Sequence, residues 1–227
     1  MSLIRETART VRNQSRASIQ RFRLKHALAR LDRLLIARQT PSPDLLARLI
    51  PLWGNEAWST DAPLLSAVLE WLSRTKGPIL ECGSGLSTLI MASAARAADR
   101  TLLSLEHEQS WAERVETHLS PDLRKHAGIA ITPLNRYGDF DWYGTEKVAV
   151  PKDIGFVLCD GPPGMTRGGR YGLLPQLREK FAPGCIVILD DTQRQDERAI
   201  ANRWCSEFSA RVVQQAETFT VLSIGGN

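Results

Sequence analysis

The sequence lacks the features that would place the protein in a membrane, outside the cell or among zinc proteins. No apolar run in its 227 residues approaches the ~18 residues that cross a bilayer. Residues 1–40 hold no continuous apolar stretch, so we expect no signal peptide. The four cysteines have no metal-type spacing, and three of them lie in or beside apolar, strand-like runs. We therefore expect buried free thiols and a reducing, cytoplasmic compartment.

Acidic residues are scarce at the N-terminal end of the chain. Residues 1–40 hold nine arginines and Lys25 against only Glu6 and Asp32, which gives this arm a net charge of +8. The whole chain carries +4, so the remainder carries −4. Apolar residues from Ile19 to Leu35 recur at helical spacing between the basic ones, which predicts an amphipathic helix.

Three interpretations of the basic arm remain open. The helix packs on the body or on a second subunit, it contacts an anionic membrane or nucleic acid, or it is an organelle-targeting segment. The regular apolar stripe favours packing, and a homodimer through this helix is one form of it. Prolines 41, 43 and 51 are expected to end the arm. We therefore predict a helical extension over residues 1–50 and a single domain over residues 51–227.

A glycine-rich turn organises the rest of the chain. The apolar run Ile79–Cys82 passes through Gly83 and Gly85 into the helical pattern Leu86–Ala98. Glycines let the backbone approach a ligand closely, and the first amides of a helix are unpaired. The alternative is a strand-to-helix turn without a ligand.

The residues around this turn argue against a nicotinamide or flavin site. Thr88 stands where the dinucleotide fingerprint has its third glycine. Glu81 places a carboxylate before the turn, which suits an ammonium group and not a phosphate. An NAD-linked dehydrogenase is therefore disfavoured.

A second acidic residue ends the next strand-like run. Glu106 follows Gly85 by 21 residues, the spacing at which a carboxylate binds ribose hydroxyls. His107 beside it could stack on an adenine ring or be a surface histidine.

Trp58, in the linker before the glycine-rich turn, could reach the same ligand or fill the core. Asp139, in an expected aromatic loop over residues 135–143, could accept from an adenine amino group or be a turn residue beside a glycine.

A third apolar run ends in Asp160 and is followed by Gly-Pro-Pro-Gly. This carboxylate is expected at the carboxyl end of a central strand, where open α/β sheets bind ligands. The loop over residues 165–171 then carries Arg167, Arg170 and Tyr171, which are candidates for substrate contacts. The alternative for this loop is a solvated surface segment.

The end of the chain completes the fold prediction. Residues 211–215 and 218–224 are strand-like and are separated by only two residues, which requires an antiparallel hairpin. We therefore predict an α/β fold, a Rossmann-like, doubly wound and mostly parallel seven-stranded sheet that ends in an antiparallel hairpin.

From about residue 77 to residue 225 the chain resembles class I S-adenosylmethionine-dependent methyltransferases. The motifs occur in the family's order, with Glu-x-Gly-x-Gly from Glu81, then Glu106, then Asp160-Gly-Pro-Pro, then Asp190-Asp191. In particular it is similar to small bacterial members of unassigned substrate that share the Gly-Pro-Pro loop and the Gly-Arg-Tyr stretch.

The resemblance implies a role for each matched residue. Gly83 and Gly85 would pass close to the methionine part of S-adenosylmethionine. Glu81 would face its ammonium group, Glu106 its ribose, and Asp160 the methyl-transfer end. The hydroxyl residues of the turn are counted with the same cofactor site: Ser84, Ser87 and Thr88.

Asp160, Asp190 and Asp191 also resemble the Asp, Asp and Asn metal triad of catechol-type O-methyltransferases. Oxygen ligands from two strand ends suit Mg²⁺. The chain departs from that triad at Asp191, where the amide is expected, and it has no lysine shortly after Asp160 to act as a base.

The implied function is methyl transfer, with O-methylation of a small-molecule or glycan-type acceptor and Asp160 as the candidate base. One alternative is a non-catalytic binding or scaffold protein of the same fold. Another is a nucleic-acid methyltransferase using the basic arm. The acidic body and the Asp-Gly-Pro-Pro loop argue against that second alternative.

Overall fold

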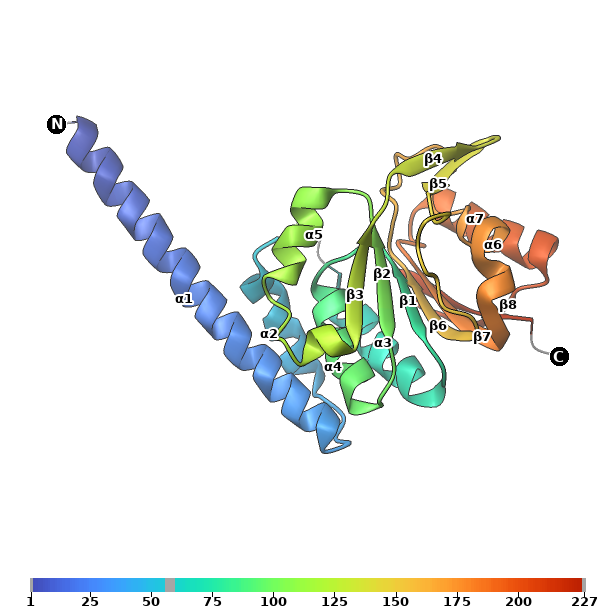
Figure 1. The fold of residues 1–227 in the computed structure, drawn as a ribbon, viewed down its shortest axis with the longest axis horizontal. Helices are drawn as coiled ribbons and strands as arrows, with labels where there is room; N and C mark the ends of the chain where they lie inside the picture. Colours follow the sequence, from blue (N-terminus) through green and yellow to red (C-terminus); the bar gives the residue numbers. More distant parts are fainter. Residues whose placement is uncertain (1, 56–59, 226–227) are drawn as a thin grey trace.

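The computed structural model describes residues 2–55 and 60–225, with side chains from residue 18 onward. Seven strands of the described chain form one sheet in the order β3-β2-β1-β6-β7-β9-β8 (Figure 1). Strand β9 runs antiparallel to both of its neighbours, and the other pairings are parallel. The predicted doubly wound sheet with a terminal antiparallel hairpin is confirmed.

The strands of this sheet begin and end close to the apolar runs of the sequence. The five parallel strands are β1 (Ile79–Cys82), β2 (Leu102–Glu106), β3 (Ala127–Ile131), β6 (Ile154–Cys159) and β7 (Phe181–Asp190). The antiparallel hairpin consists of β8 (Arg211–Gln215) and β9 (Phe219–Ile224). The central strands β1 and β6 are buried along their whole length, as expected for a sheet covered on both faces.

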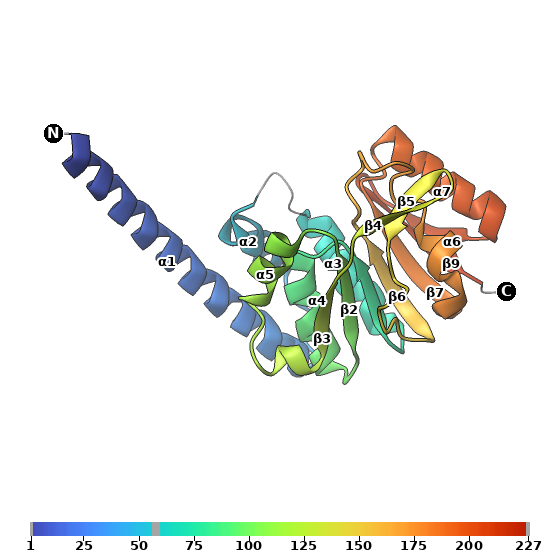
Figure 2. The ribbon, with the colours of Figure 1, turned by 45° about the horizontal axis from the view of Figure 1, so that its top comes forward.

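Helices cover the two faces of the sheet, as Figures 1 and 2 show. One face carries α2 (Pro43–Trp53), α3 (Ala62–Arg74), α4 (Leu86–Ala97) and α5 (Gln109–Glu116). The other carries α6 (Leu173–Leu177) and α7 (Gln195–Phe208). Each face has its own apolar core, because alternate strand residues point to opposite sides. Among the described residues, no helix combines the length and apolarity that a bilayer span requires.

The N-terminal helix α1 (Ser2–Ile36) docks on the body through its second half and projects away from it through its first half (Figure 1). Leu24, Leu28 and Leu31 are buried against α2 and α4. Ile19 and Phe22 are exposed, which corrects the expectation of one continuous stripe from Ile19 to Leu35. At about 100° per residue they fall on the helix side opposite to the three buried leucines.

The prolines after α1 do not end the helical extension. Ser42 caps α2 by accepting from the Leu45 amide at 3.3 Å, and Pro43 occupies the first turn, where no amide partner is lost. Pro51 lies inside α2. The expected boundary between residues 50 and 51 therefore falls within a helix that packs in the main core.

A small antiparallel hairpin replaces the expected aromatic loop over residues 135–143. Strands β4 (Leu134–Tyr137) and β5 (Phe140–Tyr143) pair only with each other in the described structure. Trp142 and Tyr143 are fully buried beside α6 and α7. The β propensity of the aromatic residues therefore outweighs the polar residues between them.

Candidate active site

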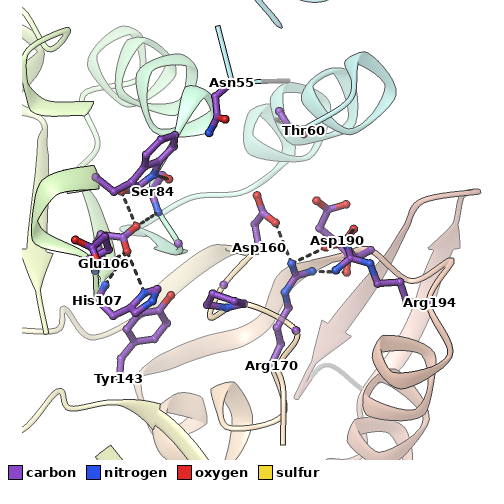
Figure 3. A pocket seen from close by; sticks show the side chains of 17 residues that line it. Asn55, Thr60, Ser84, Glu106, His107, Tyr143, Asp160, Arg170, Asp190 and Arg194 are labelled. Atoms are coloured by element: carbon purple, nitrogen blue, oxygen red, sulfur yellow. Dashed lines mark hydrogen bonds and ion pairs between the residues drawn. The ribbon is translucent and has the colours of Figure 1, made fainter. Parts of the chain in front are cut away.

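A cavity of about 540 Å³ opens at the carboxyl ends of β1, β2, β6 and β7. This is the edge at which open α/β sheets bind ligands, and the volume is typical of small-molecule sites. Figure 3 shows two groups of side chains around it. Ser84, Glu106, His107 and Tyr143 lie on one side, and Asp160, Arg170, Asp190 and Arg194 lie on the other.

The glycine-rich turn forms part of the cavity wall. Gly83 has a φ of +85°, and a Cβ there would lie 3.0 Å from the backbone nitrogen of Gly161. Only glycine fits this left-handed position and the close passage of the two loops. The turn is fastened to α4 by a hydrogen bond of 2.8 Å from the Gly85 amide to Thr88 Oγ1.

Glu81 is fully buried and does not line the cavity, in contrast to its expected contact with an ammonium group. Its carboxylate accepts hydrogen bonds from Ser87 and Thr88, both at 2.6 Å, and from Ser104. Burial raises the pKa of Glu81 to about 7, although the three hydroxyls partly oppose the shift. Through these side-chain hydrogen bonds, Glu81 of β1 connects this strand to β2 and α4.

Glu106 lines the cavity as expected and is almost fully buried. Its Oε2 accepts from the amide and the hydroxyl of Ser84 at 2.9 and 2.8 Å. Its Oε1 accepts from the amides of His107 and Glu108 at 2.8 and 2.9 Å. The His107 ring also lies against this carboxylate, with Nδ1 3.1 Å from Oε1. The carboxylate is therefore held rigidly at the wall.

The other side of the cavity is a compact charge cluster. Carboxylate oxygens of Asp160, Asp190 and Asp191 lie within 4.8 Å of one another. The buried guanidinium of Arg170 donates to Asp160 Oδ1 at 3.1 Å and to Asp191 Oδ2 at 2.7 Å. Arg194 contacts Asp191 Oδ1 at 3.0 Å. Five residues from three separate segments thus share one site.

The protonation of this cluster reflects burial and mutual repulsion. Burial raises the pKa of Asp160, with Arg170 opposing and Asp191 adding to the shift. Burial and the neighbouring Asp160 raise the pKa of Asp190 further. Burial disfavours the charged form of Arg170, but the surrounding carboxylates outweigh it and raise its pKa. Arg170 is therefore a permanent cation at the site.

Several residues expected at the site lie outside the cavity lining. Asp139 is exposed in the turn between β4 and β5, beside Gly138 with its φ of +65°. Arg167 donates to the backbone carbonyl of Gly138 in the hairpin, and Tyr171 donates to Glu207 of α7 at 2.5 Å. The remaining expected residues away from the lining are Gly85, Ser87 and Thr88. Trp58 lies outside the described residues.

The cavity also contains residues that the sequence did not single out: Asn55, Thr60, Trp111, Tyr143 and Arg194. Trp111 donates from Nε1 to the Ser84 carbonyl at 2.6 Å. The buried hydroxyl of Tyr143 has no hydrogen-bond partner among the described residues. Burial raises its pKa well above the usual value, so it remains a donor at the floor of the cavity. Asn55 and Thr60 lie on either side of Trp58 in the sequence. Their closeness to this candidate is the only sequence feature that could have indicated them as site residues.

Comparison with known proteins identifies the fold and its family. A family model described as a methyltransferase domain matches residues 80–192. This segment runs from β1 through the glycine-rich turn to the Asp190-Asp191 pair, and so includes all lining residues of the cavity except Asn55, Thr60 and Arg194. The chain belongs to the class I methyltransferases. A comparison with curated proteins finds no match.

Solved methyltransferase structures share the fold at low sequence identity. A methyltransferase from Geobacter sulfurreducens is 14% identical, with 81% of this chain and 91% of that chain covered and a TM-score of 0.56. A Staphylococcus aureus protein provisionally named a caffeoyl-CoA O-methyltransferase is 11% identical, with 83% and 95% covered and a TM-score of 0.56. A precorrin-6Y C5,15-methyltransferase from Geobacter metallireducens is 11% identical, with 75% and 91% covered and a TM-score of 0.54. The shared architecture leaves the acceptor of this methyltransferase open.

Proposed function

We propose that this methyltransferase uses S-adenosylmethionine to methylate an oxygen of a small-molecule or glycan-type acceptor. The supporting observation is one cavity that holds a ribose-type carboxylate, Glu106, at one wall and the carboxylate of Asp160 at the opposite wall. The residues present suit the cofactor. Trp111 offers an aromatic edge for a base, Tyr143 an unused hydroxyl donor, and the acidic lining favours a cationic sulfonium.

The bound cofactor would supply an activated methyl group, and the chain's own share is alignment and proton removal. The Gly83 turn and Glu106 would hold the nucleoside and amino-acid parts. Asp160 would accept the proton of the acceptor hydroxyl as that oxygen bonds to the methyl carbon and the carbon–sulfur bond of the sulfonium breaks, which leaves a neutral thioether. Its side chain is 28% exposed and faces the cavity, so that it is accessible to an acceptor while still partly desolvated.

The test is isothermal titration of the purified chain with S-adenosylhomocysteine, with Gly83→Val as the matched variant. Valine at a φ of +85° cannot be accommodated without displacing the Gly161 backbone, so the turn would lose its shape. We expect micromolar binding by the natural chain and none by the folded variant. Absence of binding by folded, ligand-free protein would contradict the proposal and favour the scaffold alternative.

We also propose that the protein is cytoplasmic and that it forms a homodimer through the N-terminal helix. Ile19 and Phe22 are exposed near the middle of α1, on the helix side opposite to its buried leucines, and support a partner there. A +8 arm beside a −4 body favours a second copy of the chain as that partner. Light scattering of the natural chain and of Phe22→Glu decides it. A monomeric natural chain would contradict the homodimer.

A further inference from the structure

A positive charge among the carboxyl groups of Asp160, Asp190 and Asp191 would stabilise their ionised forms. Their oxygens lie within 4.8 Å of one another, and like charges at that separation repel strongly in a partly desolvated site. A divalent ion is one way to supply the charge, and the resemblance to catechol-type enzymes suggests it. The chain supplies another.

The guanidinium of Arg170 already occupies this position. One terminal nitrogen bridges Asp160 Oδ1 at 3.1 Å and Asp191 Oδ2 at 2.7 Å. The other donates to the Asp190 carbonyl at 2.7 Å. The side chain is only 3% exposed, so the charge is enclosed in the cluster and not a passing surface contact. Bridging of this kind suits the planar guanidinium, which has several donors in one plane.

The second oxygen of Asp191 is also taken. Its Oδ1 lies 3.0 Å from an Arg194 nitrogen and accepts from Gln193 Nε2 at 3.3 Å. Both oxygens of Asp191 are therefore already in contact with arginine nitrogens. Mg²⁺ would need ligands at about 2.0–2.1 Å in octahedral geometry. Asp160 Oδ1 and Asp191 Oδ2 could serve as such ligands only if the buried guanidinium were displaced.

We propose that Arg170 takes the place of a divalent cation in this site, as a positioning residue that holds Asp160 and Asp191, and that the site works without metal. The metal-binding part of this inference stands independently of the reaction. The positioning part rests on the proposed function, because Asp160 is the group that Arg170 would orient toward an acceptor.

The test measures cation binding by the chain with and without Arg170. If Arg170 had only a structural role, its removal would not create a cation site. The full chain is titrated with Mn²⁺ by electron paramagnetic resonance, and its thermal unfolding is followed with and without millimolar Mg²⁺. We expect no bound Mn²⁺ and no change of Tm for the natural chain. Arg170→Met keeps the length of the side chain and empties the cluster of its cation. We expect this variant to bind one Mn²⁺ and to gain several degrees of Tm from Mg²⁺.

Arg194→Met is the matched control. It removes the other arginine from Asp191 but leaves Arg170 in place, so no cation site should appear. Stoichiometric Mn²⁺ binding by the natural chain would overturn the proposal, and so would a folded Arg170→Met chain that binds none. Should Arg170→Met fail to fold, the titration of the natural chain decides alone. The same samples are also titrated with S-adenosylhomocysteine. A failure of the cofactor proposal can then be told apart from a failure of the proposal that the site works without metal.

Discussion

Glu106 Oε2 accepts two hydrogen bonds from Ser84, one from the amide at 2.9 Å and one from the hydroxyl at 2.8 Å. With two more amides on Oε1, the carboxylate already has the roughly four partners it can accept. A ribose hydroxyl can therefore bind Glu106 only by replacing one of them. The Ser84 hydroxyl is the partner that can rotate away, because the other three donors are backbone amides.

Ser84→Ala should consequently preserve or strengthen nucleoside binding. The lost hydrogen bond is worth about 1 kcal/mol, so the affinity for S-adenosylhomocysteine should rise by up to about fivefold. Isothermal titration measures the change, with Ser93→Ala as control because the Ser93 hydroxyl binds the Leu89 carbonyl within α4. An affinity loss of about tenfold in Ser84→Ala would mean that the serine itself contacts the ligand.

Asp160→Asn should abolish transfer while leaving cofactor binding nearly intact. The substitution keeps the shape of the side chain but removes the base, and general-base catalysis typically contributes about 10²–10⁴-fold. Release of S-adenosylhomocysteine in the presence of candidate hydroxyl acceptors is the measurement. The exposed carboxylate of Asp122 provides a control through Asp122→Asn. Turnover equal to that of the natural chain would remove Asp160 from the mechanism.

Glu81 should make the protein less stable as the pH rises. Its pKa is 4.5 in the unfolded reference and about 7 when folded, so the folded state binds the extra proton. Its contribution is fully present below about pH 4.5 and is lost as the pH rises through about 7. The difference is on the order of 3 kcal/mol.

Urea unfolding of the natural chain and of Glu81→Gln, at about pH 5 and about pH 8, isolates this contribution from other groups. The natural chain should lose more stability than the variant between the two conditions. The exposed Glu179→Gln should follow the natural chain. Equal pH dependence in Glu81→Gln and the natural chain would show that the carboxylate is ionised throughout.

The docking of α1 predicts a contrast between two apolar substitutions. Leu31 is fully buried against α2 and α4, so Leu31→Ala should cost about 2–5 kcal/mol of the free energy of unfolding. Phe22 is 63% exposed, so Phe22→Ala should change stability by less than about 0.5 kcal/mol. Urea unfolding of a monomeric sample measures both. An unaffected Leu31→Ala chain would mean that α1 does not dock in solution.

Local patterns were enough to predict the frame of this methyltransferase. Alternating and continuous apolar runs located the strands, and the connection of two residues between the last two strand-like runs required an antiparallel hairpin. The glycines of the turn and the carboxylates Glu106 and Asp160 were found because they end strands. Strand ends meet at one edge of a parallel sheet, whatever the loops do.

Tertiary packing decided which side chains share the cavity and what they face. Tyr143 arrives on an inserted hairpin and Trp111 on α5, and no periodicity relates either to the glycine-rich turn. Asp139 was carried away from the site by the same hairpin. Arg170, which was predicted to contact substrate, lines the cavity and donates to both Asp160 and Asp191. The sequence by itself determined where each strand ends, because this depends on near neighbours. Only the tertiary structure decided where the loop side chains point, because this depends on charges and aromatic rings distant in the chain.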